Sequence, residues 1–150
     1  MNLNDKTMLI EVKVKVTRID GKKYKKSSST YILDRELFSQ AEYTIMQMFE
    51  EEIRSKLVSD YGIVSMRCSP IKELATQYSG KSTFVATLKD VFTDDDGNEK
   101  PIRYKVLLWA DSLPEAMSRT AEIVRQGYDM TVEGLKEVDY EYLSDNEDEI

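Results

Sequence analysis

Histidine is absent from this chain of 150 residues, and cysteine occurs once, as Cys68. The lack of imidazole excludes Ser–His and Cys–His nucleophiles and the usual zinc sites. A single cysteine excludes an internal disulfide and a cysteine cluster. No apolar run approaches the length of a membrane span, and the opening residues lack the basic and apolar regions of a signal peptide. We therefore expect a cytoplasmic protein.

Charged residues make up 33% of the chain and hydrophobic residues 41%, which predicts a well-solvated surface around a packed core. The formal net charge of −7 is unevenly distributed. All of it comes from acidic residues after Lys136, because the preceding part of the chain is neutral overall. Such a separation of charge suggests a folded body followed by an acidic tail.

Two segments of the chain show the same succession of patterns. Residues 8–16 alternate between apolar and polar, which is typical of a strand with one buried face. Asp20-Gly21 is a hairpin signal, and residues 29–33 form the return strand. The second half repeats strand, turn and strand at residues 83–88, 94–98 and 104–109.

A helix is predicted after each hairpin. From about Phe38 to Leu57, apolar residues recur at spacings of three and four. The second helix runs from about Leu113 to Arg125, with Ser112 and Glu115 in a capping-box spacing. A closing strand follows each helix, at residues 62–67 and from Met130 to about Tyr142.

Each half therefore follows a β-β-α-β plan, in which a right-handed crossover places the third strand beside the first, in the order 2-1-3. We predict an α+β protein with two tandem β-β-α-β repeats, antiparallel sheets and one helix per repeat. The two repeats either share one six-stranded sheet or form two sheets. The expected divisions are a first repeat (1–72), a connector (73–81), a second repeat (82–143) and an acidic disordered tail (144–150).

This duplicated plan, with Tyr31-Ile32-Leu33 leading into Phe38-Ser39-Gln40-Ala41-Glu42, resembles an uncharacterised family of gut bacteria and their phages. The equivalent step in the second half is Pro114-Glu115-Ala116. The resemblance covers most of residues 8–143. It implies a small accessory protein, plausibly phage-encoded, and it brings no catalytic residues with it.

The segment from Ala75 to Ser82 looks like a loosened phosphate-binding loop, since it ends in Ser79-Gly80-Lys81-Ser82. A true phosphate loop lies between a buried strand and a helix N-terminus, whose N–H groups hold the phosphates. Here the residues after Lys81 read as a strand. We therefore do not expect nucleotide hydrolysis.

Asp94-Asp95-Asp96-Gly97 suggests a calcium loop, but that pattern would place Phe92 and Arg103 at positions that need oxygen ligands. A solvated hairpin turn fits better. With no carboxylate pair at a recognisable spacing, we predict that the protein is not an enzyme. We also predict no metal and no cofactor.

The first hairpin is strongly basic and carries an aromatic residue near its tip. Cations beside aromatic rings suit single-stranded nucleic acid, in which phosphates meet Lys and Arg while bases stack on rings. The alternative is a solvated face whose lysines protect a strand edge. The candidate nucleic-acid-binding residues are Lys13, Lys15, Arg18, Lys22, Lys23, Tyr24, Lys25 and Lys26.

The acidic tail ends in an apolar residue, an arrangement that resembles the tails of bacterial and phage single-strand-binding proteins. Those tails compete with nucleic acid for a basic groove and recruit partner proteins. A purely solubilising tail is the alternative. The candidate partner-binding residues are Asp145, Glu147, Asp148, Glu149 and Ile150.

Two functions follow as expectations. The first is a non-catalytic accessory protein that binds single-stranded nucleic acid through the first hairpin, with the tail as modulator. The second is a protein-binding module, either a phage factor that binds or inhibits a host protein or a virion component, which would use exposed strand edges and the tail. No membrane partner is expected.

Overall fold

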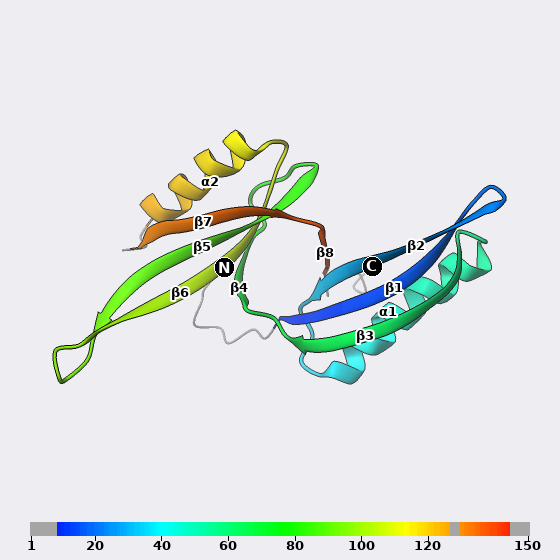
Figure 1. Cartoon of the computed structure of the whole chain (residues 1–150), viewed down its shortest axis with the longest axis horizontal. Coiled ribbons are helices and arrows are strands. Elements are labelled where there is room, and N and C mark those ends of the chain that lie inside the picture. The colour runs from blue at the N-terminus through cyan, green and yellow to red at the C-terminus, as the bar shows by residue number, and fades with distance from the viewer. Residues whose placement is uncertain (1–8, 127–129, 145–150) are drawn as a thin grey trace. The chain divides into compact units, whose positions relative to one another are not determined.

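The computed structural model describes residues 9–126 and 130–144, which fall into two compact units (Figure 1). The first unit contains residues 9–69 together with 140–144, and the second contains residues 70–126 and 130–139. Each unit holds one four-stranded sheet and one helix, and each is described by itself below.

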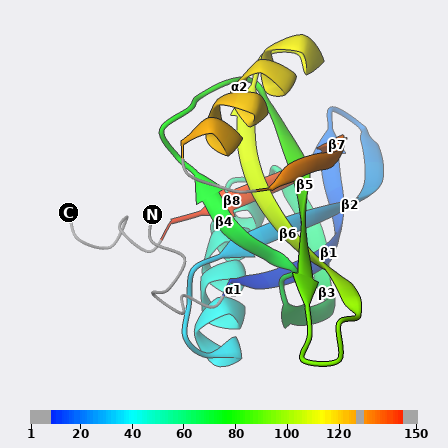
Figure 2. The ribbon, with the colours of Figure 1, turned by 90° about the vertical axis from the view of Figure 1, so that its left-hand side faces the viewer.

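The first unit has the strand order β3-β1-β2-β8. Its elements are β1 (Ile10–Asp20), β2 (Lys23–Leu33), α1 (Phe38–Arg54), β3 (Val58–Cys68) and β8 (Tyr140–Leu143). The second unit has the order β4-β6-β5-β7, and α2 lies along one face of its sheet (Figures 1 and 2). Its elements are β4 (Ile71–Ala75), β5 (Ser82–Thr93), β6 (Glu99–Ala110), α2 (Leu113–Arg125) and β7 (Thr131–Val138).

The core of the first unit forms between α1 and one face of its sheet. Ala41, Ile45 and Phe49 lie four residues apart and form the buried stripe of the helix. The Phe49 ring stacks on Tyr61 with 4.9 Å between centroids, and it meets Tyr31 edge-on at 5.9 Å. This aromatic group joins α1 to β2 and β3. The helix therefore covers one face of the sheet and leaves the other uncovered by it.

The expectation of an α+β protein with one helix after each hairpin is confirmed. The expected antiparallel sheets were wrong, because both sheets are mixed: β8 pairs parallel to β2, and β4 pairs parallel to β6. These two strands have only four and five residues. So few residues do not establish a period of two, and this explains why the sequence pattern did not reveal them.

The segment expected to be one closing strand from Met130 to about Tyr142 is two strands. β7 ends at Val138 in the second unit, and β8 begins at Tyr140 in the first unit. β4 likewise crosses the start of the segment expected to be a connector, 73–81. Its pattern is buried on both faces, so it lacks the alternation that identifies a half-buried strand.

The first helix is shorter than the expected range, which continued to Leu57. It ends at Arg54, and Lys56 follows with a φ of 61°, in the left-handed region that often terminates helices. The N–H of Leu57 donates to the carbonyl of Glu52 across this turn. Leu57 therefore lies outside the helix, and its side chain is exposed.

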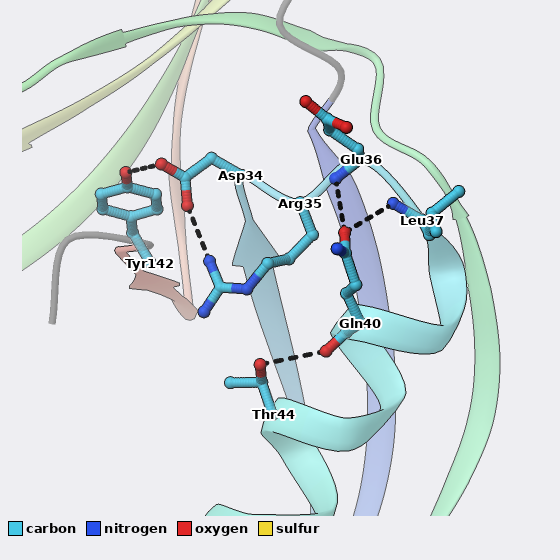
Figure 3. Close-up of polar contacts among 7 residues, drawn as sticks. All are labelled: Asp34, Arg35, Glu36, Leu37, Gln40, Thr44 and Tyr142. Atoms are coloured by element: carbon cyan, nitrogen blue, oxygen red, sulfur yellow. Dashed lines mark hydrogen bonds and ion pairs between the residues drawn. The ribbon is translucent and has the colours of Figure 1, made fainter. Parts of the chain in front are cut away.

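A polar network fastens β8 to the junction between β2 and α1 (Figure 3). The Tyr142 hydroxyl donates to Oδ2 of Asp34 at 2.8 Å, and Arg35 donates to Oδ1 of the same carboxylate at 3.0 Å. The Oε1 atom of Gln40 accepts from the N–H groups of Glu36 and Leu37, which would otherwise be unsatisfied at the helix start. The last strand is thus held by a side-chain contact as well as by its backbone pairing.

Raising the pH should weaken this attachment at the alkaline end of the scale. Burial, followed by the hydrogen bond to Asp34, raises the pKa of Tyr142 from 10.0 to about 12. The stabilisation is therefore complete below pH 10 and disappears as the pH rises through 12. Chemical unfolding of the wild type and Tyr142→Phe should show the wild type more stable at pH 7, by a margin that decreases as the pH rises from 10 to 12. Equal stability of the two proteins at pH 7 would contradict the role given to this hydrogen bond.

Candidate nucleic-acid interface

The alternation of β1 separates apolar side chains from cationic ones. Val12, Val14 and Val16 are buried in the core beneath α1. Successive residues of a strand point to opposite faces, so Lys13 and Lys15 lie on the other side of the sheet, where both are exposed. We call that side the open face of the first sheet.

Strand register assembles two rows of residues across the open face. In the first row, Thr17 lies between Asp60 on β3 and Lys26 on β2. In the second, Lys15 lies between Gly62 and Ser28. Neighbouring strands are about 4.8 Å apart, so each row spans about 10 Å. Residues distant in sequence therefore form one small surface.

A groove of about 540 Å³ lies over these rows. The pairing of β3 with β1 has two irregularities, one between Lys13 and Val14 and one between Thr17 and Arg18. Bulges bend a strand and increase its twist, and these two bracket the grooved stretch. The lining residues are Lys15, Val16, Thr17, Lys26, Ser27, Ser28, Asp60, Tyr61 and Gly62.

Charge is segregated between the hairpin and the helix of the first unit. The β1–β2 hairpin carries seven Lys and Arg residues against two acidic residues, Glu11 and Asp20. Glu11 is engaged by Arg67, whose guanidinium lies 2.7 Å from its carboxylate. Helix α1, in contrast, carries four glutamates and one arginine. Acidic side chains thus gather on the helix and cationic ones on the hairpin.

The lysines of the open face are not neutralised by neighbours. Within the part of the chain that the structure describes, no carboxylate lies within 4.0 Å of the ammonium groups of Lys13, Lys15 or Lys26. Asp60 shares the groove with Lys15 and Lys26 without forming an ion pair with either. These cations are therefore available to an anion from solution.

The structure brings some of the expected binding residues together and separates others. Lys13, Lys15 and Lys26 lie on the open face, and register places Tyr24 on the same face nearer the tip, where it is 67% exposed. Arg18 lies on the helix side and forms an ion pair with Glu52 at 3.5 Å.

The remaining residues of the expected set lie away from the open face or outside the described residues. Register places Lys23 and Lys25 on the same side of the sheet as Arg18, and Lys22 is in the hairpin turn. The tail candidates lie outside the residues that the structure describes. They are Asp145, Glu147, Asp148, Glu149 and Ile150.

Seven of the nine residues that line the groove were absent from the expected set, and four of these seven lie in the two rows. Thr17 and Ser28 share rows with Lys26 and Lys15, a relation that follows from the hairpin register. Asp60 and Gly62 come from β3, and their place depends on a bulged pairing. The alternation of β1 and β2 could have predicted the place of Thr17 and Ser28, but not that of Asp60 and Gly62.

The segment resembling a phosphate loop has a structural role. Lys81 is followed by β5, and its backbone N–H donates to Oδ1 of Asp111 at 2.9 Å. A side chain on Gly80 would overlap the backbone of Ala110, so glycine permits this close crossing. The segment continues directly into β5, whereas a phosphate loop continues into the helix whose N-terminus holds the phosphates.

The acidic turn between β5 and β6 is likewise a structural feature. Oδ1 of Asp94 accepts from the N–H groups of Asp96 and Asn98, and Gly97 takes a positive φ of 82°. Across residues 9–126 and 130–144, no group of three His, Cys, Asp or Glu residues is arranged to hold a metal ion. Neither helix in this part of the chain is long and apolar enough to cross a membrane.

Comparison with known proteins places the chain in a family. The model described as Domain of unknown function (DUF4494) matches residues 8–142. No curated protein and no solved structure matches the chain. Because the family match includes both described units almost entirely, the chain belongs to the family of domains of unknown function DUF4494.

Proposed function

We propose that this protein binds single-stranded nucleic acid on the open face of the first sheet, as a non-catalytic accessory protein. The observation that carries the proposal is the set of three exposed lysines on this face. Lys15 and Lys26 line the groove, Lys13 lies beside them on β1, and among the described residues no carboxylate lies within 4.0 Å of their ammonium groups. Phosphate contacts by such cations supply most of the affinity in nonspecific nucleic-acid binding.

A single strand fits this surface better than a duplex. Tyr24 is two-thirds exposed on the same side of the sheet and offers a ring to an unstacked base. Base stacking on an aromatic ring is tolerant of sequence and needs bases that are not held in a duplex. Lys13 and Lys15 point the same way and lie about 7 Å apart along β1, so one backbone running along the strand meets both.

The acidic residues near the C-terminus would act as a modulator in this scheme. Four of the residues from Asp145 to Glu149 are acidic, and they follow β8, which pairs with the same strand that carries Lys26. An acidic segment of the same chain competes with phosphates for a basic face. Removal of residues 145–150 is then expected to strengthen binding.

The topology also supports the proposal of an internal duplication. The order β3-β1-β2-β8 corresponds element by element to β7-β5-β6-β4, with a hairpin, a helix and a closing strand in each. The resemblance to proteins of gut bacteria and their phages leads us to place the chain, as a proposal, among cytoplasmic accessory proteins of that source. The two halves would then have diverged in charge, since the β5–β6 hairpin is not basic.

Neutralising the three lysines should remove the salt dependence of binding together with the affinity. Each phosphate contact contributes about 0.7 to the slope of log K against log salt for a single strand. Three contacts predict a slope of about −2, and a loss of about twentyfold in affinity between 50 and 200 mM salt. Lys13→Gln, Lys15→Gln and Lys26→Gln together should flatten this slope, measured by fluorescence anisotropy with a labelled oligonucleotide.

The matched control removes a lysine of the same unit from another place. Lys56 lies in the turn after α1, away from the rows of the open face, so Lys56→Gln should keep both slope and affinity. No binding at low salt by the protein lacking residues 145–150 would end the proposal. Capture of a protein partner that the triple variant retains would favour the protein-binding module.

A further inference from the structure

We infer that the groove on the open face holds a phosphorylated ribose unit, with Lys15 and Lys26 on the phosphate and Asp60 on a ribose hydroxyl. This inference rests on the proposed nucleic-acid function and adds that the groove selects ribose over deoxyribose. It starts from a feature that phosphate binding leaves unexplained, which is a carboxylate inside a cationic groove.

Asp60 lies in the same row as one of the cations. Thr17 separates it from Lys26, so the carboxylate and the ammonium arise about 10 Å apart across two strand spacings. That separation leaves room for a ligand between them, and among the described residues the two side chains do not form an ion pair with each other. A ligand lying across the row would meet a cation at one end and a carboxylate at the other.

The acceptor capacity of Asp60 is largely unused. Its Oδ1 atom accepts from the Ser59 hydroxyl at 3.5 Å, at the limit of a hydrogen bond, and among residues 9–126 and 130–144 no donor contacts Oδ2. A carboxylate accepts hydrogen bonds and repels phosphate. Asp60 therefore favours a part of the ligand that donates a hydrogen bond, which in nucleic acids means a hydroxyl or an amino group.

The ribose hydroxyl is the donor that lies closest to the phosphate in a nucleic acid. Carboxylates on ribose hydroxyls are also the usual means by which dinucleotide-binding proteins hold a sugar. Deoxyribose lacks the 2′-hydroxyl, so DNA would bring its phosphate to the lysines and leave Asp60 without a donor from that position. The 2′-hydroxyl is the group that lets a protein distinguish RNA from DNA.

The row of Gly62, Lys15 and Ser28 leaves space for a ribose and its phosphate. Gly62 lies opposite Lys15, and a Cβ atom added there would meet no atom of the protein within 4 Å. The groove of about 540 Å³ falls within the usual range for small-ligand sites. Ser28, on the other side of Lys15, adds a hydroxyl to the phosphate end. One ribose with its phosphate is thus the unit that matches the groove.

The test compares two oligonucleotides that differ only at the 2′ position, uridine RNA and deoxyuridine DNA of equal length, on the full chain. A hydrogen bond to a charged acceptor predicts that RNA binds about tenfold more tightly. Asp60→Ala should reduce this preference to less than about twofold, because only RNA loses the hydrogen bond while both strands are relieved of the same repulsion between carboxylate and phosphate.

A second variant tests whether the ligand occupies the open space at Gly62, and it leaves every charged residue unchanged. Gly62→Val adds a β-branched side chain that the fold accepts, so thermal unfolding should be unchanged while binding of both oligonucleotides weakens at least fivefold. Equal affinity of the wild type for RNA and DNA would overturn the ribose inference and leave the proposed function intact. Absence of binding to either oligonucleotide would instead remove the proposed function.

Discussion

Replacing Phe49 with alanine will lower the free energy of unfolding of the first unit by about 3–5 kcal/mol, the largest effect expected from one side chain in this protein. Phe49 is fully buried, and its ring contacts Tyr31 on β2 and Tyr61 on β3. Truncation leaves a cavity between α1 and the sheet that these two rings cannot fill without moving. Both aromatic contacts are lost as well.

Chemical unfolding followed by circular dichroism measures this loss. Met46→Ala is the matched control, because Met46 lies on the same helix with its side chain 39% exposed, and it should cost less than about 1 kcal/mol. A loss below 1 kcal/mol for Phe49→Ala would show that α1 is not packed on the sheet as described. Since β1 to β3 also form the open face, the variant should weaken oligonucleotide binding only under conditions that unfold the unit.

Replacing Gly80 with alanine will destabilise the second unit by about 3 kcal/mol, the upper end of the usual cost of overpacking. A Cβ atom at this position would lie 2.4 Å from the carbonyl carbon of Ala110 and 2.6 Å from its backbone nitrogen. Backbone atoms have no rotamer by which to move aside, so the crossing of this segment over the end of β6 must open. The hydrogen bonds of Arg119 should be disrupted as well, because its guanidinium donates at 2.7 Å both to the carbonyl of Ser79 and to that of Trp109.

Gly62→Ala is the control for this prediction, because the added methyl group there meets no atom within 4 Å. It should change the melting temperature of the protein by less than about 2 °C. The same experiment separates two interpretations of the Ser79-Gly80-Lys81-Ser82 segment. A phosphate loop would make Gly80→Ala lose nucleotide binding, whereas the close backbone crossing predicts a loss of stability with or without nucleotide.

Periodicity predicted the long elements of the fold well. The valines of β1 alternate with lysines, and the apolar residues of α1 recur every four positions, so one element identifies a sheet face and the other a helix face. The range Leu113–Arg125 of α2 was predicted correctly because Ser112 caps its start, accepting from the N–H of Glu115. The order of β1 to β3 in the first sheet and of β5 to β7 in the second agrees with the predicted order 2-1-3, which followed from crossover handedness.

The parts that the sequence did not predict depend on contacts between distant residues. β4 and β8 are too short to show a period, and each joins the sheet of the unit that does not contain the preceding strand. Asp60 and Gly62 reach the open face through a pairing with two irregularities, and a bulge changes which residues share a face. No local pattern reports the position of such a bulge.

The sequence alone could have separated Arg18 from the lysines of the open face. Arg18 has the same parity along β1 as Val16, so alternation alone places it on the helix side, where it meets Glu52. A two-residue turn closed by Asp20 and Lys23 likewise sets Lys26 opposite Thr17. The density of basic residues along the chain predicted the hairpin as a binding site, but strand geometry decides which of its cations can act together.

Nuclear magnetic resonance of the full chain during titration with a single-stranded oligonucleotide tests the location of binding most directly. We predict salt-sensitive shifts in the backbone signals of Lys13, Lys15, Ser28 and Gly62, with the signals of α2 unchanged. Shifts confined to α1 or the second unit, or no shifts at low salt after removal of residues 145–150, would contradict the assignment of nucleic-acid binding to the open face.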